Sequence, residues 1–222
     1  MRPSESWSKA RFTAAFTLVT AACWLIAFVL DQLGFVAVAG GFWPGPERFG
    51  YADSHGFFVP LWLTPITATL IHAGIIHLAF NLLILVFCGR RVENVLGPVS
   101  FLILYLLGAY AAAGAQYLVD PAPAAPMIGA SGAISAVLGA YAMLFGRNRV
   151  SAVTGRLAVW INALWLMVTW VILQVAVGIA SAQGGFPFTG TGMAIASAAH
   201  IGGFIIGVIL AQPLLRFRWR KA

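Results

Sequence analysis

Five polar residues lie inside long apolar stretches of this sequence, where polar side chains are uncommon. They are His72, His77, Asn81, Ser131 and His200. Polar groups at bilayer depth are costly, so they usually have a function. A serine hydroxyl beside an imidazole is the arrangement of a nucleophile activated by a general base. The residue types therefore predict a serine hydrolase, provided that the fold brings Ser131 and His200 together.

The spacing from the next arginine along the chain indicates how deep each polar residue lies. His77 lies 13 residues before Arg90, and Ser131 and His200 each lie 16 residues before an arginine. At 1.5 Å per helical residue, these spacings are roughly 20 to 24 Å. Three polar side chains on three different helices are thus expected in one layer, below the outer edge of a hydrocarbon core about 30 Å thick.

Small residues surround both candidate groups. Ser131 lies in the segment 129–132 (Gly-Ala-Ser-Gly), at the start of an apolar run, and a helix start offers free N–H groups and a positive dipole end. Both features suit an oxyanion. His200 is followed by Gly203 and Gly207 on the same helix face, and small faces let membrane helices pack closely. Close packing is expected to bring the two side chains into contact.

The composition indicates an integral membrane protein. Of 222 residues, 61% are hydrophobic and 9% charged, with a mean hydropathy of +0.91, which is more apolar surface than a soluble domain of this size can bury. The net charge of +7 is divided among short clusters between apolar runs, so we expect no nucleic-acid binding. Cys23 and Cys88 are read as small buried residues, and no cleavable signal peptide is apparent.

The predicted fold is all-α, a six-transmembrane-helix bundle forming a single domain over residues 1–222. Twelve of the thirteen Lys and Arg residues fall on one side of the predicted spans, and only Arg48 falls on the other. Both termini should therefore be cytoplasmic. The expected spans are 12–34, 62–88, 98–118, 130–145, 157–181 and 191–212.

Three loops are expected on the outer side, at 35–61, 119–129 and 182–190. The fourth span is short and begins only where the Pro-rich loop 119–129 ends, so this loop must dip into the protein. Non-helical backbone at that depth is tolerated only when it is buried in protein or lines a watery cavity. A hydrolase needs such a cavity, because water must reach a bond inside the membrane.

At this point the residues resemble those of the rhomboid family of intramembrane serine proteases. The segment 72–81 is similar to the family pattern His-(four residues)-His-(three residues)-Asn, and Gly89-Arg-Arg-Val-Glu93 is similar to the motif that closes that helix. The segment 129–132 resembles the nucleophile motif. Ala199-His200, with Gly203 and Gly207, resembles the base motif. The resemblance covers nearly the whole chain, in order.

The resemblance implies a dyad of Ser131 as nucleophile and His200 as base. It also implies that His77, Asn81 and the Ser131 N–H hold the oxyanion, with Gly129, Gly132, Gly203 and Gly207 as structural glycines. It implies transmembrane substrates cut near the outer surface, with no cofactor and no metal. Two positions depart from the family pattern. Leu63 follows Trp62 where the family often has arginine, and Ser135 stands where an aromatic residue often packs on the catalytic histidine.

Other functions remain open at this stage. An inactive rhomboid-like protein that only binds membrane helices would keep the fold, although the retained serine and histidine argue against it. A metal or haem protein would use His72, His77 and His200. Helical periodicity predicts that His72, five residues before His77, faces elsewhere and has a structural role. Neither the substrate nor the oligomeric state can be read from the sequence.

Overall fold

The computed structural model describes residues 10–45, 48, 50, 56, 58–146, 156–183 and 197–219, without the side chains of 156, 177–183 and 219. In these ranges the regular elements are helical, and one isolated antiparallel bridge joins Phe42 to Met127. The helices are α1 (Arg11–Val29), α2 (Leu33–Gly40), α4 (Thr64–Thr67), α5 (Ile75–Ile84), α6 (Arg90–Leu96), α7 (Pro98–Val119), α8 (Ser131–Phe145), α9 (Arg156–Gln183) and α10 (Ser197–Trp219). Two 3₁₀ turns, η2 (Leu61–Leu63) and η3 (Ala68–Leu70), flank α4, and a π-helical turn, η4 (Leu85–Gly89), joins α5 to α6.

Five segments of the described chain are long and apolar enough to cross a membrane. They are Arg11–Val29, Ile75–Leu96, Pro98–Val119, Leu157–Ala176 and Ser197–Arg218. Helix α8 has 15 residues and falls short of that length. Of the predicted spans, 98–118 and 130–145 differ from α7 and α8 by one residue at most. The predicted third outer loop, from residue 184 on, lies outside the described residues.

The second predicted span, 62–88, is not one continuous helix. The short turns of residues 61–70 end at Ile71, which is extended, and α5 begins only after Gly74, which is also extended. From Ile75 the helix runs on to Leu96, eight residues beyond the predicted end. The break has a consequence for the site, because helical periodicity does not carry across residues 71–74.

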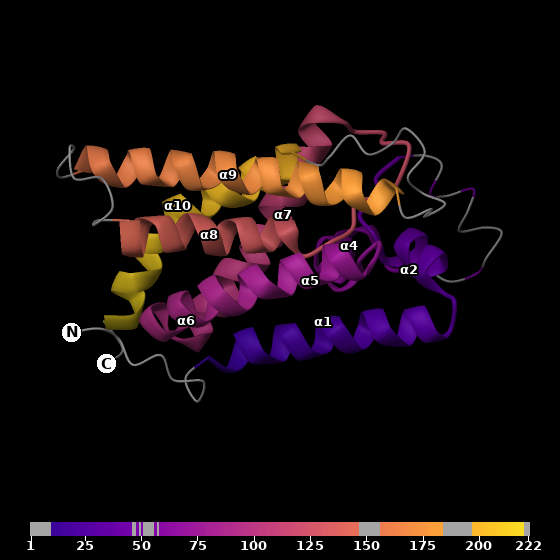
Figure 1. Ribbon diagram of the computed structural model, residues 1–222, viewed down its shortest axis with the longest axis horizontal. Coiled ribbons are helices and arrows are strands. Elements are labelled where there is room, and N and C mark those ends of the chain that lie inside the picture. The colour runs from indigo at the N-terminus through magenta and orange to yellow at the C-terminus, as the bar shows by residue number, and fades with distance from the viewer. Residues whose placement is uncertain are drawn as a thin grey trace.

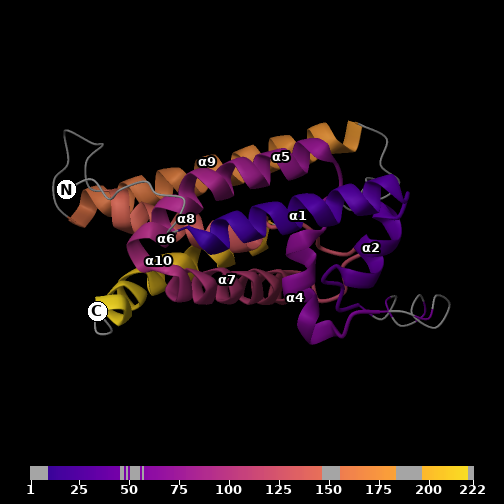
Figure 2. The same cartoon turned by 90° about the horizontal axis from the view of Figure 1, so that it is seen from below.

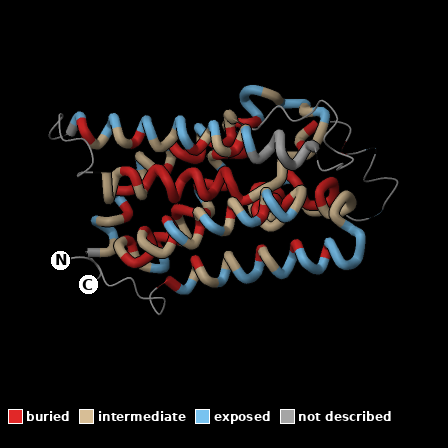
Figure 3. Tube along the Cα trace, in the orientation of Figure 1, coloured by how far each residue is buried: buried red, intermediate tan, exposed pale blue. Residues whose placement is uncertain are grey.

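Helix α8 lies in the middle of the molecule, between α9, α5, α7 and α10 (Figures 1 and 2). Eleven of its fifteen residues are buried, and buried positions run along its length in Figure 3. The exposed large apolar side chains lie instead on other parts of the described chain, such as α1, α7 and α9. Helix α8 is thus surrounded by protein, and the outer helices carry the surface that suits lipid.

Small residues allow α8 and α10 to touch at backbone distance. At three positions along their contact, a Cβ added to a glycine would overlap a backbone carbonyl oxygen of the other helix. These close approaches pair Gly203 with Gly132, Gly207 with Ala136, and Gly139 with Phe204. We call this contact the α8–α10 seam. No side chain separates the two backbones at these points, so the seam fixes their spacing.

At the end of the bundle where α1 and α9 begin and α10 ends, side chains from one segment cap another (Figure 1). The fully buried Glu93 carboxylate accepts hydrogen bonds from the backbone N–H groups of Phe12 and Thr13, at 2.9 and 2.8 Å, and from the Thr13 hydroxyl. These donors belong to the first turn of α1, whose N–H groups lack partners within the helix. The sequence predicts that Glu93 caps or pairs with its neighbours Arg90 or Arg91; the helix that it caps is α1.

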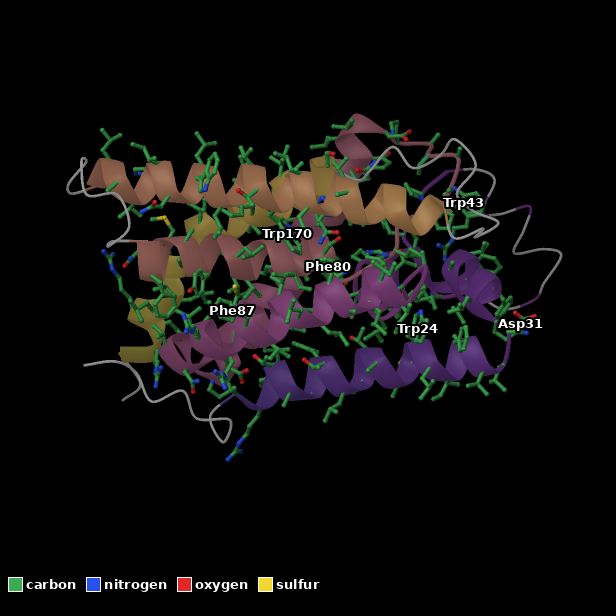
Figure 4. All side chains as sticks on the ribbon, viewed as in Figure 1. Trp24, Asp31, Trp43, Phe80, Phe87 and Trp170 are labelled. Carbon is green, nitrogen blue, oxygen red and sulfur yellow. The ribbon has the colours of Figure 1, made fainter. Side chains whose placement is uncertain are left out.

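At the opposite end, the Pro-rich loop is inserted between other segments. Met127 and Phe42 exchange two backbone hydrogen bonds of 2.9 Å, and the Gly129 N–H donates to the Ala68 carbonyl at 2.9 Å. The Trp43 indole donates to the carbonyl of Pro123 at 2.8 Å, and Figure 4 shows Trp43 at this end. The loop therefore enters the protein before α8 begins, and its backbone polar groups find partners there.

The predicted first outer loop is anchored without an arginine next to Trp62. The side chain of Arg48 is buried, donates to the Val59 carbonyl, and lies 5.4 Å from the centroid of the Phe58 ring. The Tyr110 hydroxyl of α7 donates to the Trp62 carbonyl at 2.8 Å. An arginine elsewhere in the loop and a tyrosine from α7 thus bind the segment that leads into residues 61–70.

Candidate active site

Ser131 and His200 meet where the α8–α10 seam ends. Ser131 is the first residue of α8, and His200 lies in the first turn of α10. The Oγ of Ser131 lies 2.8 Å from Nε2 of His200, and the two residues are 7% and 4% exposed. This distance is a hydrogen bond of ordinary length between a hydroxyl and a ring nitrogen. The pair has the geometry that a serine nucleophile and its base require.

The seam explains why the two side chains meet. Gly203 lies three residues after His200 on the same helix face, and its backbone lies directly against that of Gly132, the residue after Ser131. A side chain at Gly203 would push α10 away from α8 at the height of the dyad, and a side chain at Gly132 would overlap Ala112 of α7. The predicted structural glycines thus bring the two backbones together next to the two candidate catalytic residues.

Gly129 brings His77 next to the serine. Its φ is +113°, a conformation that side chains disfavour, and an added Cβ would lie 2.8 and 2.9 Å from Cε1 and Nε2 of His77. The same Cβ would lie 3.8 Å from the Oγ of Ser131. The imidazole of His77 therefore occupies the space that the glycine leaves open, with its Nε2 edge beside the nucleophile.

Asn81 lies one helical turn after His77 on α5 and is fully buried. Its Nδ2 donates to the backbone carbonyl of His77 at 3.0 Å, while its Oδ1 has no hydrogen-bond partner among the described residues. A side-chain amide has two N–H groups. One of them is engaged by the helix, and no acceptor for the second is found among the described residues.

The prediction that His72 faces away from His77 is wrong. The two rings contact each other edge to face, with centroids 4.9 Å apart, and Nε2 of His72 accepts a long hydrogen bond of 3.4 Å from the N–H of Ala130. The reason is the break at residues 71–74, which removes His72 from the helix that carries His77. His72 therefore supports the segment that leads into Ser131.

Two residues at the site were not singled out for this role by sequence reasoning. Trp170 of α9 is buried, and its ring lies edge to face with His200, with centroids 6.3 Å apart. Its Nε1 donates to the Oγ of Ser135 at 2.7 Å, and that Oγ lies 2.7 Å from the Ser131 carbonyl, to which it donates. The sequence predicts only a lipid-facing or packing role for Trp170. The available signal was Ser135, which leaves space for an aromatic ring from another helix.

The described residues contain no group of three or more His, Cys, Asp or Glu side chains that is placed to bind a metal ion. Within the same ranges, Nδ1 of His200 has no hydrogen-bond partner. The three described acidic residues lie elsewhere: Glu93 binds α1, Asp31 follows α1 at the far end of the molecule (Figure 4), and Asp120 follows α7. Among the described residues, the hydrogen bond of His200 is with Ser131 and its aromatic ring contact is with Trp170.

Comparison with known proteins places this chain in a family. The family described as the Rhomboid domain matches residues 61–217. The rhomboid protease GluP of Bacillus subtilis is 33% identical over 155 residues, which cover 69% of this chain and 26% of GluP. The rhomboid protease GlpG of Enterobacter sp. is 28% identical over 204 residues, covering 88% of this chain and 62% of GlpG.

The GlpG of Haemophilus influenzae is 30% identical over 145 residues, which cover 65% of each chain. The matched part of this chain thus spans less than two thirds of each of these three relatives. The family match includes the break that carries His72, helices α5 to α9 and nearly all of α10, and so contains the histidines, the asparagine and the serine described above. The chain is an integral membrane protein that belongs to the rhomboid family of intramembrane proteases.

Proposed function

We propose that this protein is a serine endopeptidase that cleaves transmembrane segments of other membrane proteins, with Ser131 as nucleophile and His200 as general base. The observation that carries the proposal is the 2.8 Å contact between Oγ of Ser131 and Nε2 of His200 in a buried position. A free serine hydroxyl is a weak nucleophile, and an adjacent base that removes its proton activates it.

The proposed reaction has two steps. In the first step, Oγ of Ser131 bonds to the substrate carbonyl carbon while its proton passes to Nε2 of His200. His200 then gives this proton to the leaving amine as the peptide C–N bond breaks. This step leaves an acyl-enzyme on Ser131. In the second step, a water molecule gives a proton to His200 and its oxygen bonds to the acyl carbon. The ester C–O bond then breaks, and His200 returns the proton to Oγ of Ser131. The neutral imidazole needed at the start is supported by its burial away from carboxylates among the described residues.

Three groups are proposed to stabilise the oxyanion formed in each step. The N–H of Ser131 lies at the start of α8, where helix N–H groups are free and the dipole end is positive. His77 borders the same space at Gly129, and Asn81 retains one free N–H. In this proposal the N–H of Ser131 from α8 and the side chains of His77 and Asn81 from α5 act on the same oxyanion, as oxyanion stabilisation requires.

The proposed topology has six spans within one membrane domain, with α8 as the short fourth span and both termini cytoplasmic. Arg11, the pair Arg90 and Arg91, Arg156 and Arg218 all belong to the ends of helices at one end of the bundle (Figure 1). Ser131 lies at the opposite end of α8. By the positive-inside rule, the active site would open toward the outer side of the membrane, in a bacterium the plasma membrane.

Cleavage of a reporter that carries a transmembrane segment, by the purified protein in lipid vesicles, tests the function. We expect Ser131→Ala and His200→Ala each to lower the cleavage rate by at least about 10³-fold, and the double variant to be no worse, because the pair acts as one unit. A fluorophosphonate probe should label the wild type and not Ser131→Ala. Labelling or cleavage that persists in Ser131→Ala would refute the nucleophile. An inactive wild type would favour a protein that only binds membrane helices.

A further inference from the structure

The ring of His200 needs more than its bond to Ser131 to be fixed. Its Nε2 makes that bond, and Nδ1 has no partner among the described residues. Rotation of a histidine ring about its last side-chain bond has broad minima, so one hydrogen bond leaves the ring plane poorly defined. A base must keep its lone pair aimed at the hydroxyl, because small errors in orientation are costly to the rate.

The indole of Trp170 supplies that restraint by packing. It is 3% exposed, and its ring plane makes an angle of 65° with the His200 ring at a centroid distance of 6.3 Å. This edge-to-face arrangement is the preferred one for aromatic pairs. Rotation of the imidazole would bring it against the indole or away from it, so the indole defines one face of the histidine's site.

A chain of two hydrogen bonds holds the indole itself. The Ser135 hydroxyl accepts from Nε1 of Trp170 and donates to the carbonyl of Ser131, both at 2.7 Å. A hydroxyl can accept and donate at once, so both bonds are satisfied. Ser135 is fully buried and lies one turn after Ser131 on α8. The indole that packs on His200 is therefore linked through the Ser135 hydroxyl to the backbone carbonyl of Ser131.

From this geometry, and resting on the proposed proteolysis, we propose that Trp170, oriented by Ser135, is the positioning residue that fixes His200 for catalysis. Trp170 belongs to α9, whereas the dyad belongs to α8 and α10. The small Ser135 side chain leaves the space that the indole enters. The aromatic contact on the base thus comes from a different helix than the nucleophile.

Helix α9 provides a matched control. Trp165 is 71% exposed and lies five residues before Trp170, so it faces away from the dyad. If Trp170 acts on catalysis, Trp170→Ala should lower kcat for reporter cleavage by about 100-fold with KM within about twofold, while Trp165→Ala leaves both unchanged. Equal losses in the two variants, or a loss confined to KM, would overturn the proposal.

Two smaller changes test the hydrogen bonds without emptying the site. Trp170→Phe keeps a ring but removes the indole N–H, and Ser135→Ala removes its acceptor. Each should lower kcat by about 3- to 10-fold, and the double variant should be no slower than either, because both remove the same bond. Independent, multiplying losses would contradict the proposed linkage, as would wild-type rates in both single variants.

The same assays separate this proposal from the proposed function. If wild-type cleavage depends on Ser131 but not on Trp170, only the positioning role fails. If the wild type shows no cleavage that depends on Ser131, the proposed function fails, and with it the reaction that Trp170 would serve. Folding of each variant is checked by its thermal unfolding, and Trp170→Phe remains informative if Trp170→Ala does not fold.

Discussion

The α8–α10 seam and the region around the predicted outer loops 35–61 and 119–129, here called the outer region, hold the candidate active site in different ways. In the seam, two helices touch through glycines, with backbone against backbone at three positions. In the outer region, single side-chain bonds join the segments, such as Trp43 to Pro123, Tyr110 to Trp62, and Thr67 to the Gly40 carbonyl. The seam leaves no space for an added atom between the two backbones. The outer region is joined by separate hydrogen bonds of about 1 kcal/mol each.

This difference indicates a division of roles. The seam determines the distance between the backbones that carry Ser131 and His200, whereas the two side chains can still rotate. The outer region is joined by single hydrogen bonds that can break one at a time, which would suit the entry of substrate and water in the proposed proteolysis. Substitutions in the seam should therefore affect folding and catalysis together, and substitutions in the outer region should affect either one only slightly.

The largest effect is expected from Gly207→Val in the seam. Its side chain would overlap the backbone of Ala136, so the helices must separate, and we expect a loss of more than about 3 kcal/mol in unfolding free energy together with nearly all cleavage activity. Gly114→Ala on α7 is the control, because its Cβ would meet nothing within 4 Å. Unfolding in mixed micelles measures the stability. A stable, active Gly207→Val protein would show that the seam does not fix the dyad.

An intermediate effect is expected from Gly129→Ala, where the seam and the outer loop meet. The substitution combines a positive φ with a Cβ placed 2.8 Å from the His77 ring. We expect a loss of about 1 to 2 kcal/mol in stability from the backbone alone, and a fall of at least about 30-fold in cleavage rate as His77 is displaced.

Gly56→Ala separates these two causes. Gly56 also has a positive φ, +72°, but an added Cβ would meet nothing within 4 Å. The Gly56→Ala variant should lose as much unfolding free energy as Gly129→Ala or less, and it should cleave the reporter at the wild-type rate. If Gly129→Ala and Gly56→Ala have the same rate, the position of His77 beside the serine does not matter to the reaction.

The smallest effect is expected from Tyr110→Phe in the outer region. It removes the hydrogen bond from the tyrosine hydroxyl to Trp62, which should lower the unfolding free energy by about 0.5 to 1.5 kcal/mol and change the cleavage rate by less than about threefold. Tyr117→Phe, on the same helix, is the control, since no hydrogen bond of that hydroxyl is found among the described residues. A loss of all activity in Tyr110→Phe would show that this region is as rigid as the seam.

The parts of the fold that follow from local signals could be predicted from the sequence. Helix α7 begins at Pro98 after Gly97, and α8 begins after the Gly-Ala of the nucleophile segment, so both have clear start signals. Helix α10 was predicted to end at 212, but it continues through Pro213 to Trp219. A proline removes one hydrogen bond of the helix, which membrane helices tolerate because neighbouring groups replace it.

The contacts of His72 and Trp170 could not be predicted, because they depend on tertiary structure. In an apolar segment, hydropathy does not reveal a break such as residues 71–74, and the position of His72 follows from that break. Trp170 and Ser135 are 35 residues apart on different helices. Nothing in the local sequence distinguishes the buried Trp170 from the exposed Trp160 and Trp165 of the same helix.

The enclosure of α8 by other helices has a consequence for how the protein responds to its bilayer. Acyl chains press on α1, α7 and α9, whose large apolar side chains are exposed, whereas no such side chain belongs to α8. Lipids of different chain length would tilt the outer helices, whereas residues 131–140 of α8 are all buried in protein. The height of the Ser131 hydroxyl is therefore set by the protein frame, so the proposed proteolysis should cut a substrate at the same position in thin and thick membranes.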